Sequence, residues 1–205
     1  MENTCIMLAT PFYTPVDLRC VFEDVDLKGE GVVIDSHITI IYAKELIIPK
    51  EDVLKDIIVF LGEEFDEFED MLKRDDKFKV MDLFELGTFN NDNSSYIVLK
   101  MKKEGMGWDY LESMNKAISR KYDIKSDFSE YNPHITLAEV KPGEADKYLD
   151  SKKLSLILED SKISVDDIIV SYGSPETDWK QYHVTNYHAL DRFFKIQNDS
   201  KNKLY

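Results

Sequence analysis

Two short stretches of the sequence place a histidine and a threonine at the same spacing. Residues 37–40 read His-Ile-Thr-Ile, and residues 134–137 read His-Ile-Thr-Leu. We call them the first tetrad and the second tetrad. The chain contains only four histidines, so half of them occur in this one pattern. The repetition at two distant places in the chain indicates a shared task for the two histidines.

The residue types of the tetrads suit acid–base chemistry on a phosphate. Imidazole can accept and donate a proton near neutral pH, because its ordinary pKa is about 6.5. One imidazole can take a proton from an attacking oxygen while another protonates the leaving oxygen. Threonine hydroxyls can donate to phosphate oxygens and stabilise charge in the transition state without a metal. The candidate catalytic residues are therefore His37, Thr39, His134 and Thr136, and the predicted reaction is phosphodiester cleavage.

Other interpretations of the histidines compete with this one. A single tetrad is also compatible with an ordinary half-buried strand, in which His and Thr are satisfied polar groups. His183 and Thr185 repeat the spacing, but Asn186 follows, so we assign His183 and His188 to an ordinary C-terminal strand. A zinc site would need carboxylates or cysteines at ligand spacing, which the sequence does not offer. We expect no metal and no cofactor.

Strand geometry explains how each tetrad would present its polar groups. Successive side chains of a strand point to opposite faces, so His37 and Thr39 share one face and the two isoleucines share the other. The second tetrad follows the same rule. Each tetrad would thus bury two apolar side chains and present an imidazole and a hydroxyl roughly 6–7 Å apart.

The remaining chain predicts a mixed arrangement of strands and helices. We expect strands at 4–12, 32–43, 78–89, 95–101, around His134, at 163–172 and at 179–190, and helices at 49–62, 64–73 and 108–122 and shortly after Pro142. Residues 17–31 read as an irregular acidic connection, in which 23–30 is either a lid or a surface loop. The order favours an α+β fold over a doubly wound sheet. We expect one domain over residues 1–205, with a frayed tail from about residue 195.

Composition limits the partners. Forty acidic and 26 basic residues give a net charge of −14, with lysines interleaved among acids, so long duplex nucleic acid is a poor ligand. A small phosphorylated molecule in a local pocket remains compatible with this charge. The N-terminus lacks a secretory pattern and no apolar run would cross a bilayer, so we expect a cytoplasmic protein with no membrane partner. Cys5 and Cys20 then stay reduced.

The tetrads and their surroundings resemble the two-histidine (2H) phosphoesterase superfamily, which includes the LigT-like RNA cyclic phosphodiesterases. Residues 78–89 resemble the central strand of that family, which ends in Gly-x-Phe, here Gly87 and Phe89. Pro133 before the second tetrad is also typical. Residues 168–174 and 179–184 are similar to the closing strand pair, so the resemblance extends from residue 4 to about residue 190.

The resemblance implies a two-lobed α+β fold with pseudo-twofold symmetry, in which each lobe gives one tetrad to a central cleft. It also implies catalysis without metal, with His37 and His134 as the acid–base pair and Thr39 and Thr136 binding the phosphate. Which histidine is the base depends on the orientation of the substrate and stays open.

Departures from the family concern the substrate. LigT-like enzymes that act on RNA ends usually carry basic residues near the cleft, whereas this chain is strongly acidic. In size and context it resembles phage anti-CBASS nucleases, which degrade the cyclic oligonucleotide messengers of bacterial defence; the compartment would then be the host cytoplasm. The alternatives are an RNA 2′,3′-cyclic phosphodiesterase, a 2′,5′-oligonucleotide phosphodiesterase, a non-catalytic nucleotide-binding module, and an interaction protein without a nucleotide site. The oligomeric state stays open.

Nucleotide bases need surfaces on which to stack, and an aromatic side chain contributes about 1–3 kcal/mol to each stacked base. The candidates lie near the ends of the expected strands. Tyr182 is favoured because its strand resembles the closing element of the family. The full set of candidate substrate-binding aromatics is Tyr13, Tyr42, Trp108, Tyr131, Trp179 and Tyr182.

Overall fold

The computed structural model describes most of the chain. The described residues are 3–33, 35–44, 59–60, 78–104, 106–124, 130–164, 167–173 and 180–183. They form two four-stranded antiparallel sheets, one small three-stranded sheet and several helices. Each of the larger sheets contains one tetrad.

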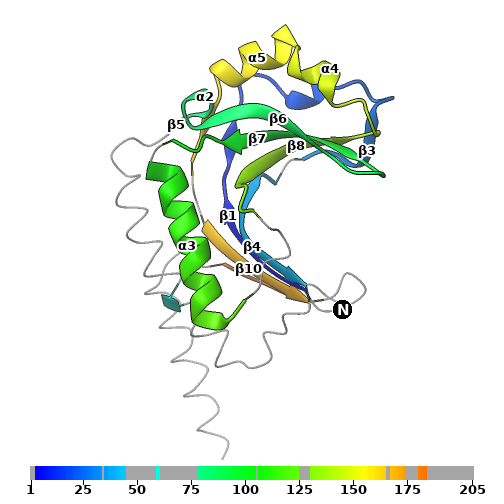
Figure 1. Ribbon diagram of the computed structural model, residues 1–205. Coiled ribbons are helices and arrows are strands. Elements are labelled where there is room, and N and C mark those ends of the chain that lie inside the picture. The colour runs from blue at the N-terminus through cyan, green and yellow to red at the C-terminus, as the bar shows by residue number, and fades with distance from the viewer. Residues whose placement is uncertain are drawn as a thin grey trace, which may run out of the picture.

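The first large sheet has the strand order β11-β10-β1-β4. Its strands are β1 (Asn3–Ala9), β4 (His37–Lys44), β10 (Asp167–Gly173) and β11 (Lys180–His183). The long helix α3 (Met106–Tyr122) lies against it and contacts β4 (Figure 1). The buried side chains of α3 are spaced three and four residues apart, as helix geometry requires for one apolar face: Leu111, Met114 and Ile118.

The second large sheet has the order β3-β8-β7-β6. Its strands are β3 (Leu27–Val32), β6 (Phe84–Asn90), β7 (Ser95–Met101) and β8 (His134–Val140). Three helices accompany it, α2 (Val80–Leu83), α4 (Asp146–Leu149) and α5 (Lys152–Glu159). In Figure 1, α4 and α5 cover the face of this sheet that is turned away from the first sheet.

We call each large sheet, together with the helices packed against it, a lobe. A small third sheet connects the two lobes at one side. It consists of β2 (Phe12–Tyr13), β9 (Lys162–Ile163) and β5 (Phe78–Lys79), with β9 in the middle. A single 3₁₀ turn, η1 (Leu18–Cys20), follows β2.

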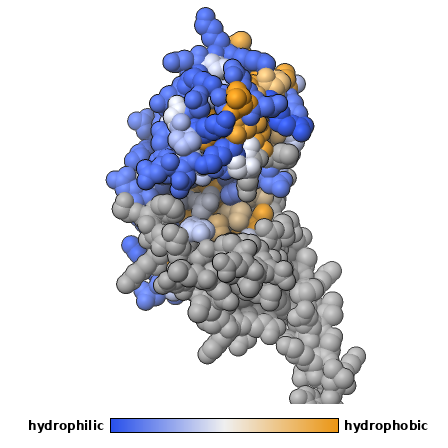
Figure 2. Space-filling model, turned by 90° about the vertical axis from the view of Figure 1, so that its right-hand side faces the viewer, coloured by the Kyte–Doolittle hydropathy of each residue, from blue (hydrophilic) through white to orange (hydrophobic). Residues whose placement is uncertain are grey.

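Buried apolar side chains of both lobes form one continuous cluster, which includes Ile6, Ile40, Leu99 and Leu158. On the face shown in Figure 2, hydrophilic residues cover most of the upper part and apolar residues are exposed only in small groups. None of the helices in the described part of the chain is both long and apolar enough to span a bilayer.

The predicted α+β class is confirmed, and so are the strand at 95–101 and a helix over 108–122. The continuous strand predicted at 32–43 is wrong, because β3 ends at Val32 and β4 begins at His37. The segment 17–31 is not wholly irregular, since β3 occupies its second half and pairs with β8.

Two other predicted strands are interrupted. Residues 78–89 contain the helical turn α2 between β5 and β6, and residues 163–172 divide into β9 and β10. The single helix expected after Pro142 is two, α4 and α5. The helices predicted at 49–62 and 64–73 lie outside the described residues, except for helical residues 59 and 60, as do the tail and most of the strand at 179–190. The prediction of one domain over 1–205 therefore stays a prediction.

Candidate active site

The two tetrads begin two strands that touch each other. His37 is the first residue of β4 and His134 is the first residue of β8, and these strands from different sheets are in contact. The contact between β4 and β8 brings the two histidines near each other, and the positive charge of His37 contributes to the lowered pKa of His134. The fold thus brings together the two histidines that the sequence singles out.

Both imidazoles are held in the same way. Nδ1 of His37 lies 3.1 Å from the carbonyl oxygen of Asp35, and Nδ1 of His134 lies 2.8 Å from that of Asn132. In each case the partner is two residues before the histidine. A carbonyl oxygen only accepts hydrogen bonds, so Nδ1 must be the protonated donor nitrogen in both rings.

This tautomer leaves Nε2 as the nitrogen of each ring that is not bound to the backbone. In a neutral ring Nε2 carries the lone pair and can accept a proton, while in a protonated ring Nε2–H can donate one. No hydrogen bond joins either Nε2 atom to a residue that the structure describes. Either histidine can therefore act as acid or as base without turning its ring.

Each tetrad strand has a β-bulge at the fourth position of its tetrad. Thr39 pairs with Met7 of β1 and Ile41 pairs with Ile6. Ile40 has no partner of its own on β1 and is the extra residue of the bulge. In β8, Thr136 pairs with Val98 of β7 and Ala138 with its neighbour, so Leu137 is the extra residue. A bulge bends its strand and increases the local twist, and bulges often re-aim side chains beside functional sites.

The bulges let each strand bury two consecutive apolar residues directly after presenting His and Thr. Ile40 and Ile41 are both buried, as are Leu137 and Ala138, whereas the His and Thr of each tetrad are half-exposed. The bulge carbonyls are satisfied. Nδ2 of Asn115 in α3 donates to the carbonyl oxygen of Ile40 at 2.7 Å. The backbone N–H of Val33, which follows β3, donates to the carbonyl oxygen of Leu137 at 2.9 Å.

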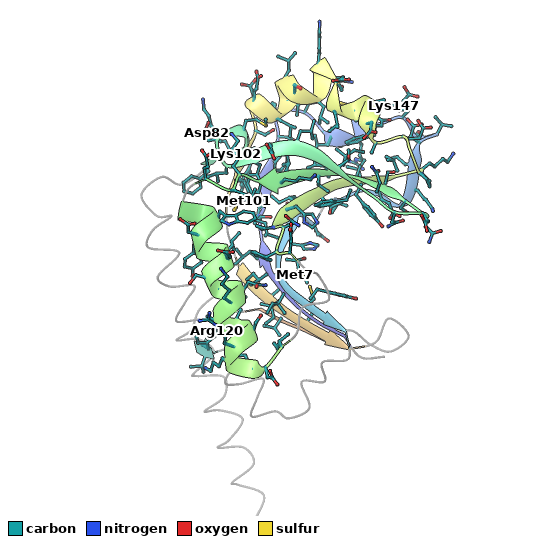
Figure 3. All side chains as sticks on the ribbon, viewed as in Figure 1. Met7, Asp82, Met101, Lys102, Arg120 and Lys147 are labelled. Atoms are coloured by element: carbon teal, nitrogen blue, oxygen red, sulfur yellow. The ribbon has the colours of Figure 1, made fainter. Side chains whose placement is uncertain are left out.

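Two side chains from other parts of the chain lie next to Thr39 of the first tetrad. Burial raises the pKa of the Cys5 thiol to about 11, and the neighbouring Thr39 hydroxyl opposes this rise. The hydroxyl of Tyr131, three residues before His134, donates to the backbone oxygen of Thr39 at 3.3 Å. Tyr131 therefore ties the segment that leads into the second tetrad to the strand of the first. Figure 3 shows Met7, the pairing partner of Thr39, near the junction of the two large sheets.

The His134 ring lies next to an aromatic ring and a lysine from two other strands of its sheet. Its ring packs edge-on against Phe89 of β6, with the ring centroids 4.7 Å apart, and its pairing partner on β7 is Lys100. Burial lowers the pKa of His134, the hydrogen bond to Asn132 opposes this, and the nearby charges of His37 and Lys100 lower it further. His134 is therefore neutral at neutral pH and suited to accept a proton.

The predicted aromatics occupy different positions. Tyr131 packs against the core and, at a centroid distance of 6.2 Å, against Trp108. Tyr42 is half-buried in β4, and Tyr13 is exposed in β2. Of Tyr182 the structure gives only its pairing with Val170, and Trp179 lies outside the described residues. The stacking roles of all these aromatics remain predictions.

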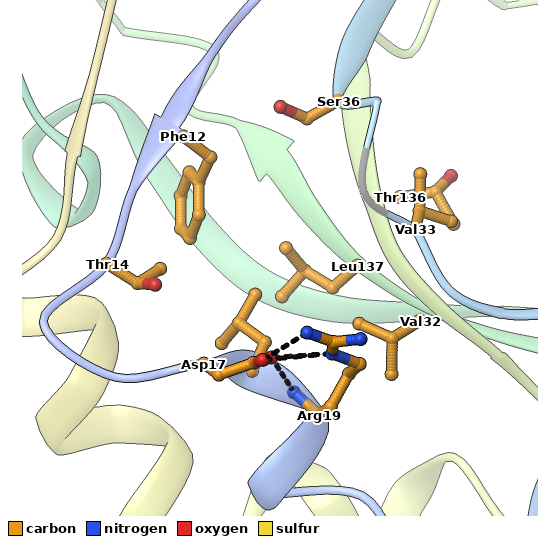
Figure 4. A pocket seen from close by; sticks show the side chains of 10 residues that line it. Phe12, Thr14, Asp17, Arg19, Val32, Val33, Ser36, Thr136 and Leu137 are labelled. Carbon is orange, nitrogen blue, oxygen red and sulfur yellow. Dashed lines mark hydrogen bonds and ion pairs between the residues drawn. The ribbon is translucent and has the colours of Figure 1, made fainter.

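A pocket opens beside the second tetrad (Figure 4). Its lining includes Ser36 and Thr136, each next to or within a tetrad, and the ion pair between Asp17 and Arg19 at 2.6 Å lies at one side of it. Its volume is about 250 Å³, and Phe12 contributes an aromatic wall. The pocket is thus a small partly apolar space, and Thr136 is the one candidate catalytic residue among those that line it.

Metal ligands are not grouped in the part of the chain that the structure describes: there, no three His, Cys, Asp or Glu side chains come close enough together to hold an ion. The residues missed by sequence reasoning act on the tetrads from other elements: Cys5, Phe89 and Lys100 from other strands of the same sheets and Asn115 from helix α3. Only Phe89 carried a signal, as the last residue of the Gly-x-Phe motif.

Comparisons with known proteins give weak likenesses. A solved structure described as a phosphoesterase is 14% identical, with 87% of this chain and 99% of that chain covered and a TM-score of 0.41. The structure of E. coli LigT complexed with 3′-AMP is 13% identical, with 88% and 99% covered and a TM-score of 0.40. No family model and no curated protein matches the chain. At these TM-scores the function has to be inferred from the geometry of the site.

Proposed function

We propose that the protein is a phosphodiesterase that cleaves a small nucleotide by acid–base catalysis with His37 and His134. The observation that carries the proposal is the paired geometry of these histidines. Both begin strands that touch, both have Nδ1 held by the carbonyl two residues earlier, and both leave Nε2 available. A merely structural histidine has no need of this duplication.

The reaction would proceed by in-line displacement at phosphorus. One Nε2 takes the proton of the attacking hydroxyl or water as its oxygen bonds to phosphorus. The bond from phosphorus to the leaving oxygen breaks, and the other imidazole, protonated at Nε2, gives that oxygen its proton. The histidines end with exchanged protonation states and re-equilibrate through solvent. Thr39 and Thr136 donate hydroxyl hydrogen bonds to the phosphate oxygens on which charge builds up.

For the substrate we propose a cyclic oligonucleotide messenger of bacterial antiphage defence, acted on in the cytoplasm of the host cell. The net charge of −14 disfavours long polyanions, and a small ligand held by local contacts is compatible with it. An RNA 2′,3′-cyclic phosphate, a 2′,5′-linked oligonucleotide, and binding without turnover are the competing outcomes of the test.

The test is a substrate panel analysed by mass spectrometry. The EDTA-treated protein is incubated with cyclic di- and trinucleotides, 2′,3′-cyclic mononucleotides and 2′,5′-linked adenylates, beside a His37→Ala/His134→Ala double variant. We expect cleavage by the wild type alone, and the bond that is cut identifies the substrate class. Recovery of every compound intact, with one of them bound, would replace the catalytic proposal by a binding module.

A further inference from the structure

Both ends of the Gly-x-Phe motif of β6, Gly87 and Phe89, contact the side chain of Lys100 on β7. A Cβ atom at Gly87 would lie 2.8 Å from Cε and 2.9 Å from Cδ of Lys100, closer than real Cβ contacts allow. The side chain of Lys100 therefore crosses from β7 directly over the backbone of Gly87. Glycine at this position leaves the space that the lysine occupies.

Phe89, the other end of the motif, holds the lysine next to the candidate acid–base residue. Nζ of Lys100 lies 4.6 Å from the centroid of the Phe89 ring, a cation–π distance. The same ring packs against His134 at 4.7 Å. The ammonium, the aromatic ring and the imidazole thus form one group on neighbouring strands.

Lys100 is not neutralised by the protein in the part that the structure describes. Its pairing partner on β6 is Glu85, yet no ion pair joins the two side chains, and the lysine extends toward Phe89 instead. Two positive charges then face each other whenever His134 is protonated, an unfavourable arrangement in the absence of an anion. A phosphate bound between Lys100 and His134 would supply the negative charge that the described residues do not place there.

We propose that Lys100 is a substrate-binding residue whose ammonium pairs with a phosphate oxygen beside His134, and that Gly87 and Phe89 position it there. The inference deepens the proposed function, on which it rests, by assigning an anion-binding cation to the same site. In a protein with a net charge of −14, such a local cation offsets the repulsion that an anionic substrate meets. Charge-assisted hydrogen bonds of this kind are stronger than neutral ones.

Three variants separate charge from packing. Lys100→Met keeps an unbranched apolar stem over Gly87 but removes the ammonium, whereas Lys100→Arg keeps the charge. Lys103→Met is the matched control, because Lys103 also rests on an aromatic ring, that of Trp108 at 5.5 Å, but is exposed. A purely structural Lys100 would tolerate methionine.

Gly87→Ala provides an independent route to the same effect. The three atoms nearest to the new methyl group all belong to the flexible end of Lys100, so we expect the lysine to be displaced while β6 stays folded. Because the two substitutions remove one interaction, the Gly87→Ala/Lys100→Met double variant should bind phosphate no more weakly than Lys100→Met alone. Additive losses would mean that Gly87 acts elsewhere.

The measurement is an NMR titration of the His134 ring with inorganic phosphate, together with KM on any substrate found in the panel. We expect the wild type, Lys103→Met and Lys100→Arg to bind with similar affinity, and Lys100→Met and Gly87→Ala to bind about tenfold or more weakly. Unchanged affinity in Lys100→Met, or no response of His134 to phosphate, would overturn the proposal. Lysine-dependent binding without turnover in the panel would instead reject catalysis and leave this inference standing.

Discussion

The candidate active site depends on a few side chains whose chemical state follows from their surroundings. Burial is the main cause of the lowered pKa of His134, and the positive charges of His37 and Lys100 add to it. A base that is neutral at working pH fits one half of an acid–base pair. The pKa of this ring is therefore the most informative property of the site at the scale of single residues.

We expect NMR titration of the free protein to give His134 a pKa below the ordinary 6.5. Replacing His37 by glutamine removes a nearby positive charge, so the pKa of His134 should rise in that variant. Lys116→Gln, which removes an exposed charge on α3 that is paired with Glu112, is the control and should leave the titration unchanged. The same His134 pKa in the wild type and in His37→Gln would show that the two rings do not interact.

The two threonines are expected to contribute through their hydroxyl groups alone. Thr39→Val and Thr136→Val keep the shape of the side chain but remove the donor, so each should lower kcat by about 10²–10³-fold. Thr88→Val is the matched control, since Thr88 lies on β6 and its hydroxyl is directed to Asp146. Steady-state kinetics on the cleaved substrate test this. Wild-type rates in both tetrad variants would remove the threonines from the mechanism.

The sequence was sufficient to identify the tetrads because each lies within one strand, where spacing alone determines the face. It could not identify Lys100 or Cys5. Lys100 reaches His134 only because β7 pairs with β8, and Cys5 reaches Thr39 only because β1 pairs with β4. Strand pairing is a long-range property that no local pattern in the sequence encodes.

At the scale of elements, the bulges in β4 and β8 decide how the tetrads are presented. The side-chain amide of Asn115 in α3 donates to the carbonyl oxygen of Ile40, the extra residue of the bulge in β4, so we expect α3 to support this bulge. Side chains of a regular strand alternate between buried and exposed, and a bulge adds one residue to this alternation. The two consecutive buried isoleucines at 40 and 41 are the sign of the bulge in the sequence.

Asn115→Leu should leave that carbonyl without its partner. We expect a loss of about 1–3 kcal/mol in the free energy of unfolding and a fall in kcat that exceeds the effect on KM, because the first tetrad is misplaced while phosphate binding by Lys100 persists. Chemical denaturation and steady-state kinetics measure the two effects. Lys116→Ala, one residue further along α3, should be neutral in both. Full activity in Asn115→Leu would mean that the bulge forms without α3.

The acidic segment 23–30 is anchored to the second lobe, which the sequence alone did not reveal. Asp26 is buried, accepts a hydrogen bond from the hydroxyl of Tyr148 at 2.6 Å, and pairs with Lys147 of α4 at 2.6 Å. Residues 27–30 belong to β3 and extend the sheet beside β8. Most of this segment therefore belongs either to β3 or to the contacts of Asp26 with Lys147 and Tyr148.

Asp26→Asn should destabilise the protein at neutral pH but not in acid. The hydrogen bonds from Lys147 and Tyr148 lower the pKa of Asp26 below its ordinary 3.8. The stabilisation is therefore complete well above that value and is lost as the pH falls through the lowered folded-state pKa. Thermal unfolding at pH 7 and in acid compares the variant with the wild type. Asp92→Asn, which changes an exposed carboxylate in the loop between β6 and β7, is the control. A destabilisation by Asp26→Asn that stays the same as the pH falls from neutral into acid would refute the assignment.

For the whole molecule, the net charge and the two-lobed arrangement set what can reach the site. The α+β class followed from the order of predicted strands and helices, whereas the breaks within 32–43 and 78–89 did not. In both places an apolar, β-rich run continues through a turn, as at Val80, which is buried in α2 rather than in a strand. Tertiary packing overrides local propensity there.

The charge predicts that long duplex DNA does not compete with the small substrate. At physiological ionic strength the net charge of −14 opposes the close approach of an extended polyanion. Adding duplex DNA to the cleavage assay should leave the rate unchanged, with a single-stranded oligonucleotide of equal charge as the control. Strong inhibition by the duplex would reveal a basic surface that the described residues do not show.

The central claim is that His37 and His134 carry one reaction together, and the most direct test is kcat for His37→Ala, His134→Ala and the double variant on the cleaved substrate, in EDTA and with folding checked by circular dichroism. Each single variant should lose about 10²–10⁴-fold, and the double variant should be hardly worse than either, because residues that act as a unit are not additive. Full activity in either single variant, or losses that simply multiply in the double variant, would contradict the claim.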